Sequence, residues 1–409
     1  MQKRKDNKGR VLKEGESYRK SDGLYMYRWI SGNDKRNTIY CATLEGLREK
    51  EDAIQSDLHE GIRTGVSKVT LNEVYELWKQ DKVGLKQNTR TNYCYMYEHF
   101  VKKDFGWKKI QSIRKSDVRR FYNGLVDKKR LAIATIDNVH TVLHQVFKLA
   151  VEDGYIRSNP SDGVPGDVKR SHNYQMPKRH ALTIPQQKAF IGFIERKPAY
   201  YHWLPLFKFF LGTGCRVSEI VGLRWRDVDM EEGLIDINHN MVYYKRDGSK
   251  RYFAITTPKT QAGCRIIPLM PEVREALLQE RENQREREIT CQVTIDGYTD
   301  FIFLNRFGGP HNPSTINRAI KRITLLHNEE ELEKAEKERR EPILIPPFSC
   351  HNLRHTFATR YCENETNLKV IQEIMGHRDV STTMDVYAEA TKDAKVKSFA
   401  NLTGKILIS

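Results

Sequence analysis

The chain contains 409 residues, which is more than one hydrophobic core usually serves, so we expect two or three domains. It carries 69 lysines and arginines against 53 acidic residues. The net charge of +16 suits a polyanionic partner such as nucleic acid, although a merely soluble basic protein can have the same composition. No apolar segment follows the basic amino terminus, and no later run is long enough to span a bilayer, which predicts a cytoplasmic protein without membrane association.

Seven cysteines are scattered along the chain, and none forms a C-x-x-C pair. This odd number favours reduced thiols over a disulfide framework or a zinc site. The sequence contains no phosphate-binding Walker loop and no carboxylate cluster of the kind found in polymerases and nucleases. We therefore expect neither a cofactor nor a metal ion.

Residues 1–66 predict a small, basic α+β domain. Side chains alternate between two faces over 24–30, which is a strand pattern, and a turn leads to a returning strand at 37–42. Apolar residues then recur at helical spacing between 44 and 58, so one helix should back the sheet. Such a sheet can lie in the major groove of DNA, or it can be an accessory domain whose aromatic side chains are all core.

Residues 67–170 predict an all-α domain. Apolar positions at helical spacing indicate helices near 71–78, 93–100, 116–125 and 135–151. Basic residues punctuate the helix ends and loops, as in a DNA clamp, although a solvated surface is the usual meaning of such residues. The prolines and glycine between Asn159 and Gly166, with the basic run that ends at Arg179, indicate a linker to the third region, 171–409.

In the third region helices resume from Thr183, with Pro185 in a first turn. An apolar helix at 204–211 ends in a glycine-rich break, and Arg216 follows at the entrance of the next helix. Free amide groups and the helix dipole favour an anion there, although a structural arginine is equally compatible with the pattern. Ser218 is expected to cap this helix, which should continue to Leu223.

The middle of the third region predicts a small antiparallel sheet. Its strands are expected at 234–238, 241–245, 252–257 and 265–269. The turn at 258–263 joins the last two strands as a hairpin and carries Lys259, a position at which a lysine is ordinarily solvated. The charged helices at 273–290 and 329–341 are interpreted as solvated surface or a subunit contact.

The stretch from 347 to 390 holds polar residues at helix starts and ends. Ser349 can cap a helix on which His351 and Arg354, three residues apart, share one face and can grip one anion. An amphipathic helix at 368–375 should stop at Gly376, so that His377 emerges at its end. Ser381 is expected to cap a further short helix, with Tyr387 about two turns in. Taken singly, these residues indicate a surface helix and a packing tyrosine.

Taken in this order, His351, Arg354, His377 and Tyr387 resemble the carboxy-terminal signature of the tyrosine recombinases. The resemblance is closest to the integrases of bacterial conjugative transposons. Arg216 with Glu219 matches the family's first arginine and its neighbouring acid, and Lys259 matches a lysine that this family inserts into the minor groove. The resemblance implies three domains: 1–66 with a three-stranded sheet and a helix, 67–170 with a SAM-like helical bundle, and 171–409 with the mainly α tyrosine recombinase fold, a small antiparallel sheet and a tail.

The resemblance also implies a role for each residue. Tyr387 would be the nucleophile, Arg216 and Arg354 would hold the nonbridging phosphate oxygens, and Lys259 would protonate the leaving 5′-hydroxyl. His351 would act as base, His377 would hold the phosphate, and Glu219 would support the arginines. The implied activity is site-specific recombination through a 3′-phosphotyrosyl intermediate and a Holliday junction, by which a mobile element is integrated and excised.

The implied partners are double-stranded DNA at crossover core sites and arm sites, and further copies of the chain, a dimer to a tetramer in the synapse. An excisionase and a DNA-bending host protein are also expected, and the tail at 395–409 is a conjectured docking segment. The side chains that we expect to contact DNA are Tyr27, Arg28, Lys35, Arg36, Lys108, Lys109, Arg119 and Arg120. The alternatives are DNA relaxation by a type IB topoisomerase and a DNA-binding regulator without catalytic activity.

Overall fold

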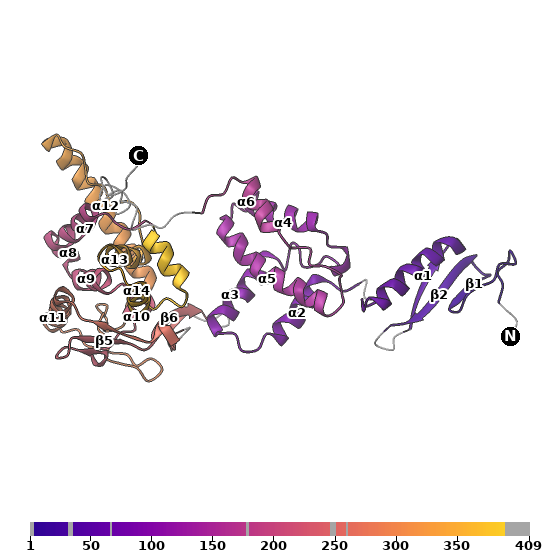
Figure 1. The fold of residues 1–409 in the computed structure, drawn as a ribbon, viewed down its shortest axis with the longest axis horizontal. Helices are drawn as coiled ribbons and strands as arrows, with labels where there is room; N and C mark the ends of the chain where they lie inside the picture. The colour runs from indigo at the N-terminus through magenta and orange to yellow at the C-terminus, as the bar shows by residue number, and fades with distance from the viewer. Residues whose placement is uncertain are drawn as a thin grey trace, which may run out of the picture. The chain divides into compact units, whose positions relative to one another are not determined.

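The computed structural model describes residues 4–31, 36–65, 68–176, 180–245, 251–258 and 261–388. The chain forms two compact units, Met1–Met176 and Pro177–Ser409 (Figure 1). Lys35, Lys259 and the tail at 395–409 lie outside the described residues. Among the helices that the structure describes, none is long and apolar enough to cross a membrane.

The first unit begins with the three-stranded antiparallel sheet that the family resemblance implies, and two of its strands are those that the sequence pattern predicts. Its strands β1 (Glu16–Arg19), β2 (Leu24–Ile30) and β3 (Arg36–Cys41) lie in the order β1-β2-β3. Helix α1 (Leu44–His59) covers one face of the sheet and begins at Thr43, whose side chain accepts a hydrogen bond from the amide of Gly46. Tyr25 and Tyr27 pack with Leu44 and Leu47 in a small core, because one face of β2 is apolar.

The rest of the first unit is helical, as the apolar spacing predicts. Its elements are α2 (Leu71–Asp81), α3 (Gln87–Phe100), the 3₁₀ turn η1 (Ile110–Ser112), α4 (Lys115–Asp127), α5 (Ile133–Glu152) and α6 (Val164–Ser171). The rings of Tyr75 and Tyr97 stack in the core with their centroids 3.6 Å apart. Helix α5 contributes its whole apolar face to this core, which makes it the central element of the bundle.

Helix α6 occupies part of the segment 159–179 for which the sequence predicted a linker, so that prediction is wrong for residues 164–171. Gly163 adopts a left-handed conformation (φ 72°) at the start of the helix, and Pro165 lies in its first turn, where a missing amide hydrogen costs nothing. Val164 and Val168, one turn apart, are buried against α4 and α5. The apolar i, i+4 pair therefore outweighs the proline and glycine signals.

The second unit is mainly helical around a core rich in phenylalanine. Its helices are α7 (Ile184–Arg196), α8 (Pro198–Tyr201), α9 (Leu204–Thr213), α10 (Val217–Ile220), α11 (Pro271–Glu286), α12 (Pro313–Glu338), α13 (Cys350–Asn364) and α14 (Leu368–Met375), with 3₁₀ turns η2 (Trp225–Asp227) and η3 (Gln261–Gly263). Residues 380–388 are also helical. Helix α9 packs against α7, α11 and α13 and buries Phe207, Phe209 and Phe210. Because α9 is enclosed, its carboxy-terminal end has a fixed position inside the unit.

Two small sheets cover one side of this unit. In the first, β4 (Val228–Asp229), β5 (Leu234–Ile237) and β8 (Arg265–Pro268) lie in the order β4-β5-β8. In the second, β6 (Asn240–Lys245) pairs with β7 (Arg251–Thr256). The predicted strands are confirmed, but the predicted hairpin of the last two is wrong, because β8 pairs with β5 and not with β7.

The two charged segments of the second unit each have a buried face. Helix α11 buries Val273, Ala276 and Leu277 and packs against α9, although its sequence is dominated by charge. Helix α12 begins at Pro313, well before the charged stretch, and its first turns enter the core. The interpretation of 273–290 and 329–341 as solvated surface therefore holds only for the outward faces of these helices.

Candidate active site

Arg216 lies at the junction between the end of α9 and the start of α10. Its backbone amide donates to Oε2 of Glu219 and its Nη1 to Oε1 of the same carboxylate, both over 2.8 Å. Glu219 therefore forms a capping box with Arg216, the N-cap residue of this short helix. The predicted cap at Ser218 is wrong, since its hydroxyl donates to Oδ1 of Asn240 over 3.0 Å, and the helix stops at Ile220.

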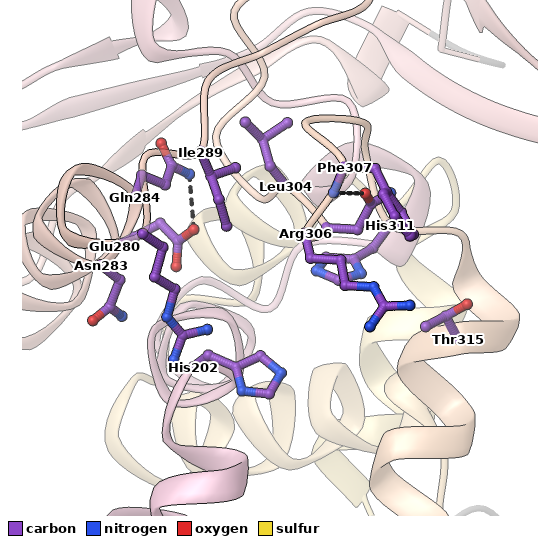
Figure 2. A pocket seen from close by; sticks show the side chains of 12 residues that line it. His202, Glu280, Asn283, Gln284, Ile289, Leu304, Arg306, Phe307, His311 and Thr315 are labelled. Carbon is purple, nitrogen blue, oxygen red and sulfur yellow. Dashed lines mark hydrogen bonds between the residues drawn. The ribbon is translucent and has the colours of Figure 1, made fainter.

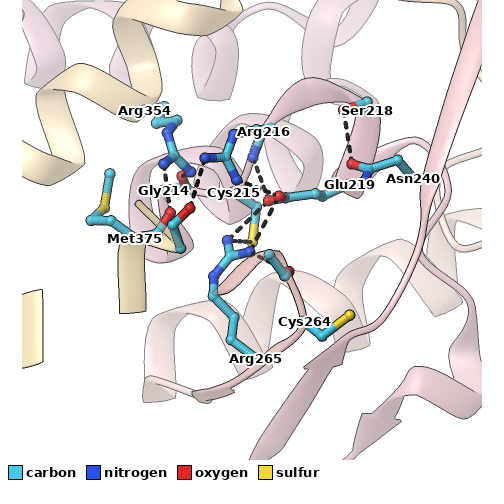
Figure 3. A network of polar contacts seen from close by, with 12 residues as sticks. Gly214, Cys215, Arg216, Ser218, Glu219, Asn240, Cys264, Arg265, Arg354 and Met375 are labelled. Carbon is cyan, nitrogen blue, oxygen red and sulfur yellow. Dashed lines mark hydrogen bonds and ion pairs between the residues drawn. The ribbon is translucent and has the colours of Figure 1, made fainter. Parts of the chain in front are cut away.

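Glu219 is the buried carboxylate that joins two guanidinium groups (Figure 3). It is 2% exposed, and Nη2 of Arg265 donates to its Oε2 over 2.9 Å. Burial alone would raise the pKa of Glu219, but the hydrogen bonds and charges of Arg265 and Arg216 lower it to about 2. Glu219 is thus fully ionised at neutral pH and orients both arginines.

Arg265, at the start of β8, is a site residue that the sequence analysis did not select. Its side chain is 5% exposed, and its Nε donates to the carbonyl of Ile374 over 2.7 Å. The strand pattern at 265–269 located the element, but strand pairing alone turns this side chain toward Glu219. An arginine at the start of an otherwise apolar strand was the one available signal.

Arg354, on helix α13, extends toward Arg216, Glu219 and Arg265. It is 4% exposed, and it donates to the carbonyls of Gly214 (2.7 Å) and Met375 (2.6 Å), which belong to the ends of α9 and α14. Burial, together with the positive charges of Arg216 and Arg265, lowers the pKa of Arg354 to about 9. The guanidinium therefore ties three chain segments together in a strongly positive environment.

Helix α13 starts after Ser349, where the sequence predicted. The backbone amide and the hydroxyl of Ser349 both donate to Oδ1 of Asn352, over 3.0 Å and 2.9 Å. Ser349 is thus the N-cap residue of α13, as the sequence predicted, and it forms a capping box with the side chain of Asn352. This first turn carries His351, whose side chain is exposed.

His377 follows α14, which ends at Gly376 in the left-handed conformation that the sequence predicted (φ 61°). The imidazole is buried, and its Nδ1 lies 2.9 Å from the hydroxyl oxygen of Thr383. Burial, and then the charges of Arg354, Arg216 and Arg265, lower the pKa of His377 to about 4. His377 is therefore a neutral imidazole at pH 7.

Tyr387 lies in the helical segment 380–388 and is half-buried. Its ring packs against a cluster that includes Ile371 and Met375 of α14, so the tyrosine belongs to the same α13–α14 substructure as Arg354. The helical residues begin at 380, so Ser381 lies inside the first turn and is not the predicted cap.

The arrangement carries more positive than negative charge. Three guanidinium groups, those of Arg216, Arg265 and Arg354, meet one ionised carboxylate, that of Glu219. Within the described residues, Arg216 and Arg354 each make two side-chain hydrogen bonds to carbonyl or carboxylate oxygens, whereas each guanidinium has five N–H donors. A phosphate group matches both the excess charge and the planar, bidentate donors.

Of the side chains in the first unit that were expected to contact DNA, one is buried and the other described ones are exposed. Tyr27 is 4% exposed and its hydroxyl accepts from Nε2 of Gln55 over 2.7 Å, so its selection as a surface contact is wrong. Arg28 and Arg36 are exposed, one on β2 and one on β3. The other selected side chains that the structure describes also lie at the surface, namely Lys108, Lys109, Arg119 and Arg120.

The model of the phage integrase family matches residues 181–394, that of the DNA-binding domain of Tn916 integrase matches 1–58, and that of the SAM-like amino-terminal domain of phage integrases matches 70–126. A transposase from transposon Tn1545 of Streptococcus agalactiae is 32% identical over 98% of this chain and 97% of its own. A transposase from transposon Tn916 of Enterococcus faecalis is 31% identical over the same shares.

Solved structures agree with these matches. The Tn1549 transposon integrase in complex with transposon right-end DNA has a TM-score of 0.70 and 29% identity, and the match covers 82% of this chain and all of that one. A lambda integrase dimer bound to a core site shares the fold, with a TM-score of 0.53. The chain belongs to the phage integrase family, the tyrosine recombinases. Within that family it is an integrase of the conjugative-transposon type, in line with the Tn916 and Tn1545 relatives.

Proposed function

We propose that this integrase cuts and rejoins DNA through a covalent bond between Tyr387 and a 3′-phosphate, and so integrates and excises a mobile element. The observation that carries the proposal is the convergence of Arg216, Arg354 and His377 on one positive site in the α13–α14 substructure that also holds Tyr387. The site is built for the charge that develops on a pentavalent phosphorus.

In the proposed step, the phenolic oxygen of Tyr387 attacks phosphorus and the bond to the 5′-oxygen breaks. His351 takes the phenolic proton, and Lys259 gives a proton to the departing 5′-oxygen. Arg216 and Arg354 hold the nonbridging oxygens. Because one phosphodiester replaces another, the linkage energy is kept in the 3′-phosphotyrosyl bond, and a 5′-hydroxyl from the partner strand can reverse the step to give a Holliday junction.

His377 is proposed to donate a hydrogen bond to a phosphate oxygen. A neutral imidazole carries one N–H, and if Nδ1 accepts from the hydroxyl of Thr383, the proton resides on Nε2. Thr383 is fully buried on the helix that carries Tyr387, so this contact also ties the nucleophile's helix to His377. Glu219 supports the arginines, as described above.

We propose three functional domains: an arm-site domain at 1–66, a core-binding domain at 67–176 and a catalytic domain at 177–409. The family-model matches at 1–58, 70–126 and 181–394 fall inside them. The second boundary is set at 176, rather than at the expected 170, because α6 packs on α4 and α5 and the compact units divide there.

The proposed partner is double-stranded DNA at core and arm sites. The net charge of +16 and the DNA complexes of the Tn1549 integrase support it. On DNA we expect a dimer to a tetramer of this chain in the cytoplasm, with an excisionase and a DNA-bending host protein. The relatives are transposon integrases and recombinases, which supports recombination over topoisomerase-like relaxation or an inactive regulator.

The direct test is Tyr387→Phe on a nicked suicide substrate made from an element end. The variant should bind this DNA within about twofold of wild type, because the ring and its packing remain, and should form no covalent adduct on a denaturing gel. Tyr361→Phe, which changes a half-buried tyrosine of the same cluster, is the matched control and should keep the adduct. A covalent complex from Tyr387→Phe would reject the assignment.

Lys259→Ala tests the proposed general acid. Cleavage should slow about a hundredfold, since a positioned acid contributes on that order. A substrate with a 5′-sulfur leaving group, which needs no protonation, should restore much of the rate. Cleavage at the wild-type rate on the ordinary substrate would remove Lys259 from the mechanism.

A further inference from the structure

A cavity of about 530 Å³ lies in the second unit, between the end of α8, the face of α11 and the loop that precedes α12. Figure 2 shows Glu280 and Asn283 on one side of it, and Arg306 and His311 on the other. None of the arginines and histidines of the candidate active site lines it. Its volume is within the range of about 300–1,000 Å³ that small-molecule sites occupy.

The inner wall of the cavity is polar but neutral. Glu280 is buried and accepts one hydrogen bond, over 2.8 Å, from Nε2 of Gln284. Burial raises the pKa of Glu280 to about 8, so at pH 7 it is a carboxylic acid that can donate a hydrogen bond. Burial also lowers the pKa of His311 to about 4, so its ring is neutral as well.

Two further atoms of this wall lack partners. Nδ2 of Asn283 and Nδ1 of His311 are buried, and neither has a hydrogen-bond partner among the residues that the structure describes. Buried polar groups are paired in the great majority of cases, and each exception calls for an explanation. A bound molecule with polar atoms at these two positions would supply the missing partners.

The mouth of the cavity is positive. Arg287 and Arg306 are exposed at its rim, and the guanidinium of Arg306 lies 4.7 Å from the ring centroid of Phe307. Across the described part of the chain, neither guanidinium is within ion-pair distance of a carboxylate. With Glu280 protonated, the lining presents two positive charges and no negative charge.

We propose that this cavity binds a small organic anion, whose phosphate or carboxylate group is held by Arg287 and Arg306 and whose neutral polar part faces Glu280, Asn283 and His311. Planar arginine forks suit both anionic groups. The apolar side chains of Ile289 and Leu304 complete the lining and suit a ligand with a carbon skeleton rather than a bare inorganic ion. This site is separate from the chemistry proposed for Tyr387.

The first experiment is calorimetric titration of the full chain, free of DNA, with adenosine 5′-monophosphate and with citrate. Adenosine is the uncharged comparison. At least one of the two anions should bind, and the one that binds identifies the phosphate or the carboxylate source. Failure of both anions to bind at millimolar concentration would overturn the proposal, and equal binding of adenosine would overturn the role of the anionic group.

A double variant, Arg287→Ala with Arg306→Ala, tests the rim. The affinity for the anion that binds should fall at least about tenfold, as for loss of charge-assisted hydrogen bonds. Arg285→Ala is the matched control, because Arg285 is on the same helix, pairs with Glu282 at the surface and does not line the cavity. Both proteins should have the wild-type circular dichroism spectrum. A double variant that binds as tightly as the control would contradict the proposal.

Glu280→Gln tests the inner wall through pH. The charged or titratable groups that face Glu280 are Arg287 on its own helix, His202 at the end of α8, and Arg306 and His311 from the loop before α12. The histidines have lowered pKa values and the arginines stay charged, so Glu280 is the group that changes above neutrality. Wild-type affinity should fall about tenfold between about pH 7 and about pH 9, as Glu280 becomes an anion, whereas Glu280→Gln should stay within about twofold. Parallel pH profiles of the two proteins would overturn the role of Glu280.

Discussion

At the scale of single residues, Glu219 determines where two guanidinium groups point. It is buried, ionised and bonded to both Arg216 and Arg265, and Arg265 in turn holds the carbonyl of Ile374 at the end of α14. A buried carboxylate with two cationic partners is stable only while the partners remain, since desolvation of an isolated charge is costly. Glu219 and Arg265 together therefore hold Arg216 in the orientation in which it would bind the proposed phosphate.

Arg265→Ala should consequently lower the free energy of unfolding by about 3 kcal/mol, because it leaves Glu219 with one cation instead of two. Urea titration followed by circular dichroism measures this. Cleavage of a suicide substrate by the folded variant should also slow about tenfold, because Arg216 loses its fixed orientation.

Arg285→Ala removes a surface ion pair with Glu282 and should change the free energy of unfolding by less than about 0.5 kcal/mol. If Arg265→Ala and Arg285→Ala unfolded at the same urea concentration, the hydrogen bonds between Arg265 and Glu219 would not stabilise the fold as predicted.

At the scale of elements, the end of helix α14 fixes the positions of His377 and Arg216. Gly376 has φ 61°, its carbonyl accepts from Arg216, and its neighbour His377 enters the site. A Cβ atom at position 376 would lie 3.0 Å from the carbonyl oxygen of Ala262 and 3.0 Å from Nη1 of Arg265. Helix termination, the position of Arg216 and that of Arg265 therefore depend on one glycine.

Gly376→Ala should destabilise the protein by about 1–2 kcal/mol through the left-handed conformation alone. It should also slow cleavage, because the carbonyl that holds Arg216 moves. Gly124→Ala, in the interior of α4 with no atom within 4 Å of the added Cβ, is the control. That change should stabilise by about 0.5–1 kcal/mol. Thermal unfolding measures the stability of both variants, and the same cleavage assay measures their activity. If Gly376→Ala unfolded at the same temperature as Gly124→Ala and cleaved as fast, Gly376 would not have the role assigned to it.

At the scale of the whole molecule, the net charge of +16 predicts how DNA binding responds to salt. A protein that neutralises several phosphates releases the same number of condensed counterions. Its affinity for duplex DNA should therefore fall about a thousandfold between about 50 and about 200 mM salt. Fluorescence anisotropy with a labelled duplex measures this slope. A loss of less than about tenfold would show that few of the basic side chains contact the backbone.

The local elements were largely predictable, because they depend on short-range patterns. Alternation identified β2, apolar spacing identified α2 and α5, and a glycine marked the end of α14. One error occurred where two local signals competed. In α6, proline and glycine suggested a linker, and the buried Val164 and Val168 decided otherwise.

The site was predictable only in part. Arg216, Arg354, His377 and Tyr387 were selected because their order along the chain resembles a known family, and the structure brings the first three of them to one place. Arg265 was missed because its role depends on the pairing of β8 with β5, which a strand pattern does not specify. Tyr27 was misassigned because alternation gives two faces but does not say which one is covered by a helix.

The sequence by itself determined most of the helices and strands, the basic character and the order of the site residues, since these depend on local spacing and composition. Tertiary structure alone decided that Glu219 holds two arginines, that burial and these charges lower the pKa of His377 to about 4, and that burial raises the pKa of Glu280 to about 8. The physical reason is that burial and charge interactions act between groups far apart in the chain. Their strength is set by distances that only the folded molecule fixes.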